Sequence, residues 1–280
     1  MFGHNGQVAT ELRQLGAARA DVDVITLARD QADLSDPAAC AALIAACVAD
    51  AVINAAAYTA VDRAETEEAL ANVINGTTPA AMAEAAAKRA LPFLHISSDY
   101  VFDGSGTAPH RPTDPALPCN AYGRSKLLGE QGIRAAGGRY LILRTSWVFS
   151  AHGSNFVKTM LRLAQTRDNL TIVADQIGGP TPAADIAATL LALAQALKQG
   201  HPGGTYHYAG VPMTSWAGFA RETFAQAGKA TTVQDITTAD YPTPAPRPLN
   251  SRLDCASLTA DFDITPPDWR AGLAEVIEAL

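Results

Sequence analysis

The chain lacks the features typical of membrane, nucleic-acid-binding and secreted proteins. Its 280 residues contain no apolar run long enough to span a bilayer, because Asp, Arg, Gly or Pro interrupts every stretch. There is no basic run and the net charge is −7, which argues against nucleic acid and anionic membranes as partners. The N-terminus has neither the charged start nor the apolar core of a signal peptide. We therefore expect a soluble, cytoplasmic protein.

Cysteine pairs and the short motifs of hydrolases and metalloenzymes are also missing. The cysteines are scattered and include no C-x-x-C pair, which favours free thiols in a reducing compartment. No G-x-S-x-G motif of a serine hydrolase occurs, and neither does an H-E-x-x-H spacing for a catalytic metal. The sequence therefore predicts neither a Ser-His-Asp hydrolase nor a metal-dependent enzyme.

The chain does contain an alternation of short apolar runs with Ala-rich helical stretches. Continuous Val, Ile and Leu positions indicate strands buried on both faces, and their alternation with helices predicts right-handed crossovers. The expected fold class is α/β, with a Rossmann-like, doubly wound parallel sheet and a smaller C-terminal lobe. The expected strands are Val22–Leu27, Ala51–Ala56, Phe93–Ser98, Tyr140–Trp147 and Leu170–Ala174. The expected helices are Gln7–Leu15, Pro37–Ala49 with Ser35 or Asp36 as its cap, Glu67–Val73, Pro79–Arg89 with Thr78 as its cap, Ala121–Ala136, Asn155–Gln165, Pro182–Lys198, one through Ala227 capped by Thr214 or Ser215, and Pro267–Leu280.

Two glycines open the first expected helix. Gly3 and Gly6 permit a tight turn that brings a pyrophosphate close to the helix N-terminus. The G-x-G-x-x-G pattern is incomplete, with Ala9 at its last position, and a plain turn-to-helix glycine pair is the alternative. A nucleotide-binding loop normally follows a strand of about five or six residues, yet only Met1 and Phe2 precede Gly3. We expect either that most of the first strand is missing from the sheet or that the true start lies upstream.

The end of the expected strand Val22–Leu27 bears on the choice of cofactor. An acidic residue there suits the ribose hydroxyls of NAD, whereas an Arg suits a 2′-phosphate. Arg29 follows the strand, so the sequence favours NADP(H) and leaves NAD(H) possible. A solvated loop residue is the alternative for Arg29. Asp33 and Leu34 come next, close enough to frame an adenine ring.

Small residues mark the end of the expected strand Ala51–Ala56. Ligands bind at the carboxyl ends of strands in open α/β sheets. Ala56 and Ala57, within Asn54–Thr59, would let a dinucleotide approach the backbone closely. Close packing of strand against helix is the alternative, and we favour the cofactor because position and composition agree.

A Tyr-x-x-x-Lys pair is the most informative feature, although such a pair alone arises often by chance. Tyr122 and Lys126 are four residues apart and therefore share one face of a helix. A fixed positive charge beside a phenol lowers its pKa and makes it a usable acid toward a carbonyl oxygen. Ser98 ends an expected strand at the same edge and can orient that carbonyl. An exposed Tyr and Lys on a solvated helix face are the alternative, which the hydroxyl partner argues against. His95 is interpreted as a strand residue just before this edge.

The domain boundary is expected near residue 150, where prolines and aromatics increase and the elements become shorter. Residues 1–150 are predicted to form the NAD(P)-binding domain. Residues 151–280 are predicted to form a substrate-binding lobe that is interleaved with the last sheet elements. No internal repeat or low-complexity segment occurs.

In these motifs the chain resembles the extended short-chain dehydrogenase/reductases and, more narrowly, the dTDP-4-dehydrorhamnose reductase family. The resemblance covers nearly the whole chain, and its later segments are specific to this family. The matching segments are Phe2–Val8, Asn54–Glu65, Ser98–Phe102, Tyr122–Lys126, Arg144–Phe149, Asp175–Thr181 and Arg247–Leu253.

The resemblance implies NAD(P)H-dependent reduction of the C4 ketone of dTDP-4-dehydro-L-rhamnose to dTDP-L-rhamnose. It implies that Tyr122 is the general acid, that Lys126 tunes it and holds the nicotinamide ribose, and that Ser98 replaces a Thr usual in the family. The implied cofactor contacts are Gly6, Gln7, Val8, Ala57, Tyr58 and Thr59, and the implied sugar contacts are Ser98, Asp99, Tyr100, Tyr122 and Trp147.

Two alternatives and two departures accompany the resemblance. The alternatives are an NDP-sugar epimerase or dehydratase on the same scaffold, and a non-catalytic, NADP-binding regulatory subunit. Some relatives form a magnesium-bridged dimer through glutamates. Glu11 matches one such position but Ala184 replaces the other, so magnesium is doubtful and we expect a monomer or a homodimer. The short first strand is the second departure.

Overall fold

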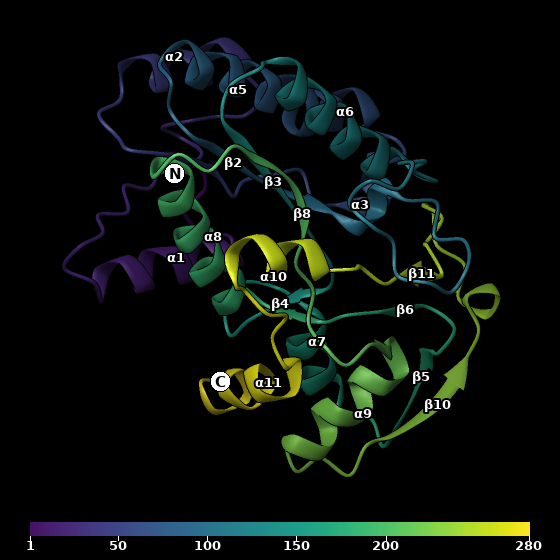
Figure 1. The fold of residues 1–280 in the computed structure, drawn as a ribbon. Coiled ribbons are helices and arrows are strands. Elements are labelled where there is room, and N and C mark those ends of the chain that lie inside the picture. The colour runs from purple at the N-terminus through teal and green to yellow at the C-terminus, as the bar shows by residue number, and fades with distance from the viewer.

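The computed structural model describes residues 1–280 and contains a parallel central sheet with helices on both faces (Figure 1). The sheet order is β1–β2–β3–β8, and all of its neighbouring strands are parallel. This confirms the expected α/β class. The four strands are β1 (Val52–Asn54), β2 (Phe93–Ser98), β3 (Tyr140–Thr145) and β8 (Gly203–His207).

The first strand of the sheet is a two-residue segment. Phe2 forms parallel bridges with both Asn54 and Leu27, so it lies between β1 and the end of the expected strand Val22–Leu27. Its amide donates to the Ile53 carbonyl at 2.9 Å, and the Leu27 amide donates to the Met1 carbonyl at 2.9 Å. The prediction of a strand over Val22–Leu27 is wrong, since only Leu27 is paired. Two residues offer too few backbone groups to hold a longer partner.

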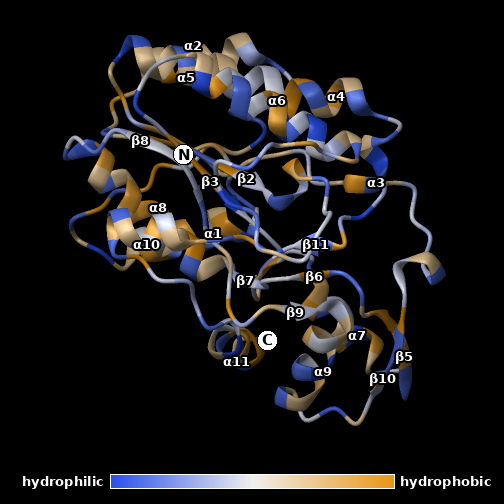
Figure 2. Cartoon of the chain, turned by 45° about the vertical axis from the view of Figure 1, so that its right-hand side comes forward, coloured by the Kyte–Doolittle hydropathy of each residue, from blue (hydrophilic) through white to orange (hydrophobic).

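Apolar side chains alternate between the two faces of the sheet, as the period of two in a strand requires. In β3, Leu141 and Leu143 pack in the cluster that contains α1 and α8, whereas Ile142 packs in the cluster that contains α2, α5 and α6. Figure 2 shows both hydrophobic and hydrophilic residues along α2, α5 and α6. One face is covered by α1 (Gln7–Ala17), α8 (Ala183–Lys198) and α10 (Ala256–Phe262), the other by α2 (Pro37–Ala46), α5 (Thr78–Lys88) and α6 (Ala121–Ala135).

Polar side chains cap several helices as the sequence predicts. Asp36 and Ser215 each accept a backbone N–H in the first turn of α2 and of α9 (Trp216–Gln226). Asn155, predicted as the first residue of a helix, caps α7 (Phe156–Leu163) in the same way. The prediction that Thr78 caps a helix is wrong. A π-helical turn, η1 (Val73–Thr77), follows α4 (Glu68–Asn72) and runs directly into α5, and the Thr78 hydroxyl donates to the Leu34 carbonyl at 2.6 Å.

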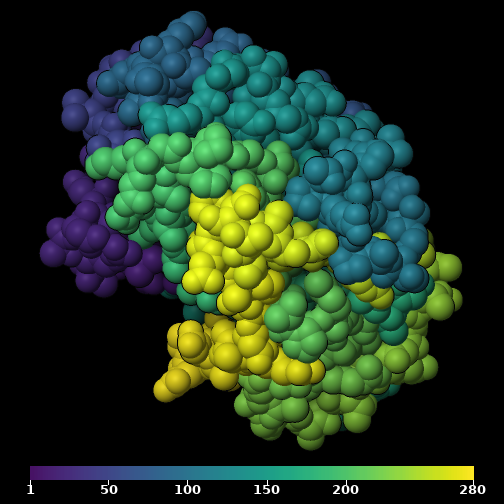
Figure 3. All heavy atoms as spheres, in the orientation of Figure 1, coloured from purple at the N-terminus to yellow at the C-terminus, as the bar shows by residue number.

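Residues beyond about 150 form a second lobe and also return to the sheet. The lobe contains a parallel pair formed by β5 and β10, so the expected strand near 170 exists but lies outside the central sheet. Its elements are α7 (Phe156–Leu163), β5 (Asn169–Val173), α9 (Trp216–Gln226), β10 (Thr232–Ile236) and α11 (Trp269–Glu278). Figure 3 shows the yellow C-terminal segment packed across both parts of the molecule. The division near residue 150 stays a prediction.

Short elements connect these parts. Two small sheets, β4–β7 and β11–β6–β9, lie between the central sheet and the second lobe. No helix is both long and apolar enough to cross a membrane. The remaining elements are α3 (Val61–Ala64), η2 (Asp99–Val101), β4 (Val148–Phe149), β6 (Ile177–Gly178), β7 (Thr181–Pro182), β9 (Thr214–Ser215), η3 (Thr238–Asp240) and β11 (Asn250–Ser251).

Candidate active site

A cavity of about 830 Å³ opens at the carboxyl ends of the central strands. It is lined by residues from the start of α1, the ends of β1, β2 and β3, the first turns of α6, and α9 of the second lobe. Most of the predicted site residues therefore lie together. Those that line it are Gly3, Gly6, Gln7, Val8, Ala56, Ala57, Thr59, Ser98, Asp99, Tyr100, Tyr122, Lys126 and Trp147.

The start of α6 places Tyr122 in this cavity. Asn120 caps the helix by accepting the Gly123 amide at 2.8 Å, and its own amide group donates to the Pro246 carbonyl at 2.8 Å. A Cβ on Gly123 would lie 2.1 Å from the Tyr100 carbonyl oxygen, so only glycine allows this helix to pack against η2. The first turn of α6 is thus fixed against the end of β2.

The Tyr122 phenol lies in a buried, partly acidic environment. Burial raises its pKa to about 12, the negative charge of Asp99 acts in the same direction, and hydrogen bonding with the Ser98 side chain opposes both. The Tyr100 ring packs edge-on against it, with centroids 5.5 Å apart. The sequence predicted instead that Lys126 lowers this pKa. The difference arises because the lysine amine is directed at β2 and does not contribute to the shift.

Lys126 is almost completely buried and bonded to the backbone of β2. Its Nζ donates to the Ile96 carbonyl at 2.7 Å and lies 3.1 Å from Nε2 of His95. Burial lowers the pKa of Lys126 to about 8, and the negative charge of Glu130 opposes the shift. The amine is therefore much closer to neutrality than a solvated lysine.

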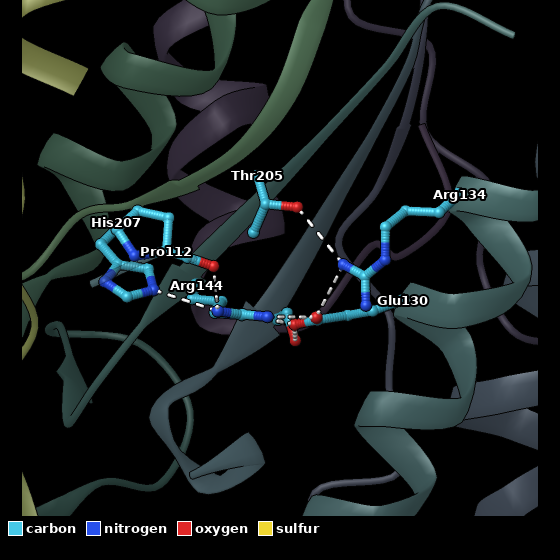
Figure 4. Close-up of polar contacts among 7 residues, drawn as sticks. Pro112, Glu130, Arg134, Arg144, Thr205 and His207 are labelled. Carbon is cyan, nitrogen blue, oxygen red and sulfur yellow. Dashed lines mark hydrogen bonds and ion pairs between the residues drawn. The ribbon is translucent and has the colours of Figure 1, made fainter. Parts of the chain in front are cut away.

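An ion pair that was not predicted from the sequence joins α6 to β3 (Figure 4). Glu130 follows Lys126 by one helical turn and accepts two hydrogen bonds from the Arg144 guanidinium, at 2.8 and 2.6 Å. Ser97 donates to the same carboxylate at 2.7 Å, and Arg134 donates at 3.2 Å. The hydrogen bonds and charge of Arg144 hold the pKa of Glu130 below its usual range despite burial. Three segments that carry site residues are thus tied together.

Asp99 is buried beside the hydroxyls of Ser98 and Tyr122. Ser98 Oγ donates to its Oδ1 at 2.9 Å and accepts the Tyr100 amide at 3.2 Å. The second carboxylate oxygen, Oδ2, has no hydrogen-bond partner within the protein. Burial raises the pKa of Asp99 to about 6, and hydrogen bonds to neighbouring groups oppose that shift. An unsatisfied buried acceptor facing a cavity suits a ligand hydroxyl.

Two stacked tryptophans close the cavity on the side of the second lobe. Trp147 and Trp216 lie face to face with ring centroids 3.7 Å apart. Trp147 has a φ of 49°, a strained conformation for a bulky residue. A Cβ on Gly178 would lie 2.8 Å from the Trp147 ring, so glycine leaves room for it. The Trp216 indole N–H is fixed by a 3.1 Å bond to Gln176. Sequence reasoning missed Trp216, whose partners are distant along the chain.

The backbone around Gly3 and Gly6 has a conformation that suits a bound dinucleotide. Gly6 precedes α1 without a side-chain cap, so the amides at the helix N-terminus are free for an anion. Gly3 has a φ of 107°, which favours glycine, and packs against the backbone of Ala55 and Ala56. A smaller cavity of about 200 Å³ adjoins it and is lined by the predicted adenine-side residues Arg29, Asp33 and Leu34.

Two predicted cofactor residues have other partners. The Gln7 side chain donates to the Val148 carbonyl at 3.3 Å and accepts from Asn155 at 2.9 Å, which ties the glycine loop to the second lobe. The Tyr58 hydroxyl donates to Glu67 at 2.6 Å, and Tyr58 lines neither cavity. Glu11 lies 3.5 Å from His152. The structure contains no cluster of three or more His, Cys, Asp or Glu side chains that could hold a metal ion.

Comparison with known proteins agrees with this architecture. The family model described as RmlD substrate binding domain matches residues 1–280. A dTDP-4-dehydrorhamnose reductase of Burkholderia thailandensis is 46% identical, over 96% of this chain and 94% of that protein. The crystal structure of the reductase of Clostridium acetobutylicum superposes with a TM-score of 0.93, at 35% identity over 99% of this chain and 97% of the other. That of Bacillus anthracis, in complex with NADP, superposes with a TM-score of 0.92, at 32% identity over 100% and 98%.

Proposed function

This chain belongs to the dTDP-4-dehydrorhamnose reductase family, and from that premise we propose that it reduces the C4 ketone of dTDP-4-dehydro-L-rhamnose with NADPH. The product is dTDP-L-rhamnose. The observation that carries the proposal is the convergence of Ser98, Tyr122 and Lys126 on one cavity beside an apolar tryptophan wall. A ketone reduction needs a proton donor at the carbonyl oxygen, and this cavity supplies one.

The cofactor would lie along the glycine loop. The amides at the start of α1 and the backbone near Gly3 would hold the pyrophosphate, and Ala56 and Ala57 would let the dinucleotide pass close to β1. Arg29 at the rim of the smaller cavity suits a 2′-phosphate. When bound, the nicotinamide ring supplies a hydride to the sugar C4.

The side chains of the cavity handle the oxygen of the ketone. Tyr122 donates a proton to it as negative charge develops, and Ser98 exchanges its bond to Asp99 for one to the same oxygen. Burial makes each hydrogen bond stronger than it would be in water. Lys126, once charged, stabilises the phenolate that remains.

The sugar lies between polar and apolar walls. Trp147 presents a flat apolar face and its indole N–H to a deoxysugar, and Trp216 holds that ring in place. Asp99 Oδ2, which has no partner within the protein, is available to accept a sugar hydroxyl.

The test is substitution of the proton donor. Tyr122→Phe removes one hydroxyl and should lower kcat for NADPH oxidation with the keto-sugar by about 100-fold or more, the usual scale of general acid catalysis. NADPH affinity, measured by fluorescence quenching, should stay within about threefold because the phenol does not hold the nucleotide. A variant with wild-type turnover would overturn the assignment of the acid.

The same assay separates the alternatives raised by the sequence. An epimerase or dehydratase would keep its dinucleotide through gel filtration, whereas a reductase releases oxidised cofactor at each turnover. A regulatory subunit would capture a stoichiometric partner and show no turnover. We expect the protein to act in the cytoplasm as a monomer or homodimer, which light scattering of the purified protein checks.

A further inference from the structure

The imidazole of His95 is a buried titratable group that the proposed reaction does not use. His95 lies in the middle of β2 and is 1% exposed. Its Nδ1 is 3.1 Å from Nδ2 of Asn54, and its Nε2 is 3.1 Å from Nζ of Lys126. It therefore connects the end of β1 to the lysine of the candidate site.

The orientation of the Asn54 amide determines which nitrogen of His95 carries the proton. Asn54 Oδ1 accepts the Ala56 amide at 3.2 Å, which leaves Nδ2 facing His95. An amide nitrogen can only donate, so Nδ1 of His95 must accept. A neutral imidazole has one donor and one acceptor, and its proton is therefore on Nε2, facing Lys126.

The proton on Nε2 of His95 determines whether Lys126 can be an ammonium group or a neutral amine. An ammonium group has three donors and no acceptor, so it cannot receive the Nε2–H of His95. A neutral amine has a lone pair for that bond and can still donate to the Ile96 carbonyl at 2.7 Å. We propose that Asn54 and His95 hold Lys126 as a neutral amine in the cofactor-free protein, and that dinucleotide binding draws a proton from solvent onto Nζ.

The charges around the amine agree with this inference. Burial lowers the pKa of both Lys126 and His95. On α6, Glu130 favours a charged lysine, but its carboxylate is already paired with Arg144 of β3. The other titratable groups of the cavity wall are the Tyr122 phenol, on the same helix, and the Asp99 carboxyl and Tyr100 phenol, which follow β2.

The inference rests on the proposed function, because a bound dinucleotide changes the balance. Its phosphates favour positive charge nearby, and its ribose hydroxyls offer acceptors for an ammonium group. A charged Lys126 then needs an acceptor at Nε2, so the His95 proton must move to Nδ1. That move requires the Asn54 amide to turn over and give up its bond to Ala56. Asn54 and His95 are thus positioning residues for Lys126.

Calorimetry of NADP⁺ binding tests this directly. The binding heat is measured at about pH 9, where a lysine with a pKa near 8 is mostly neutral, in buffers of different ionisation enthalpy. The slope of heat against buffer enthalpy gives the number of protons taken up. We expect about 0.5 to 1 proton per site, falling to less than half of that value in His95→Gln, which accepts a lysine N–H through its carbonyl.

A matched control is His207→Gln. His207 is also buried in the central sheet but contacts Arg144 and the His110 carbonyl rather than Lys126. Its proton uptake should equal that of the wild type. NADP⁺ binding to the wild type without buffer dependence would overturn the inference alone, whether or not His95→Gln folds. Absence of binding would overturn the proposed function and this inference with it.

Discussion

At the scale of single residues, the pKa of the Asp99 carboxyl group depends strongly on its surroundings. It is buried, one oxygen is bonded to Ser98, and the other has no partner. Its pKa rises from 3.8 to about 6 because burial disfavours the charged form. Such a group stabilises the folded protein fully below its unfolded-state pKa and loses that contribution as the pH rises through its folded-state pKa.

Asp99→Asn should therefore alter the pH dependence of stability. Between about pH 4 and pH 7 the Asp99 carboxyl loses a stabilising contribution of about 3 kcal/mol, at 1.36 kcal/mol per pKa unit. The variant has no titrating group at this position and therefore shows no such loss. The unfolding free energy of the variant relative to wild type should rise by about 2–3 kcal/mol over this range, measured by urea denaturation.

Asp103→Asn is the control for this change. Asp103 is an exposed carboxyl whose pKa is lowered by hydrogen bonds from Ser105, so the pH trend of its contribution has the opposite sign. A difference between Asp99→Asn and wild type that stayed constant with pH would refute the interpretation of Asp99.

At the scale of elements, the candidate site depends on how α6 is attached to the sheet. The ion pair of Glu130 with Arg144 joins the helix that carries Tyr122 and Lys126 to β3, and Ser97 adds β2. Both charged groups are almost completely buried. Removing one partner of such a pair leaves an uncompensated buried charge.

Glu130→Gln should therefore lower the unfolding free energy by about 3 kcal/mol or more, because the Arg144 charge stays buried. Glu68→Gln removes the matching carboxylate from the half-exposed pair with Arg124 and should cost about 1 kcal/mol or less. Denaturant melts of both variants check this. Equal losses would mean that the buried pair has no special role in fixing α6.

At the scale of the whole molecule, the large cavity is shared between the sheet and the second lobe. Gly6 of the first helix and Trp216 of α9 line the same space. Gln7 adds direct bonds to Val148 and Asn155. A ligand that fills this cavity contacts both parts at once and should stabilise them together.

NADPH at about 100 times its dissociation constant should raise the unfolding free energy by about 2.7 kcal/mol. Thermal melts should show a single transition that moves up by several degrees, since the ligand binds only the folded protein. The same concentration of ATP, which lacks the nicotinamide half, serves as the control and should shift the transition less. A second transition unmoved by NADPH would show that the lobes unfold independently.

Local chemistry in the sequence was enough for several elements. The apolar run Phe93–Ser98 is β2 with the same bounds, and Asp36 and Ser215 cap the helices that follow them. These features depend on neighbouring residues, which a sequence displays directly. Strand β8 escaped prediction because it opens with two glycines, and β10 because it alternates polar residues with few apolar ones.

The sequence by itself determined the α/β class, the family and the Tyr122–Lys126 pair, because each rests on spacing or on a run of adjacent residues. Only the tertiary structure decided that Phe2 pairs with both Asn54 and Leu27, that Glu130 pairs with Arg144, and that Trp216 stacks on Trp147. It also decided the contacts of Lys126, whose amine lies against the Ile96 carbonyl and His95. These contacts join residues far apart in the chain, and burial then sets their charges.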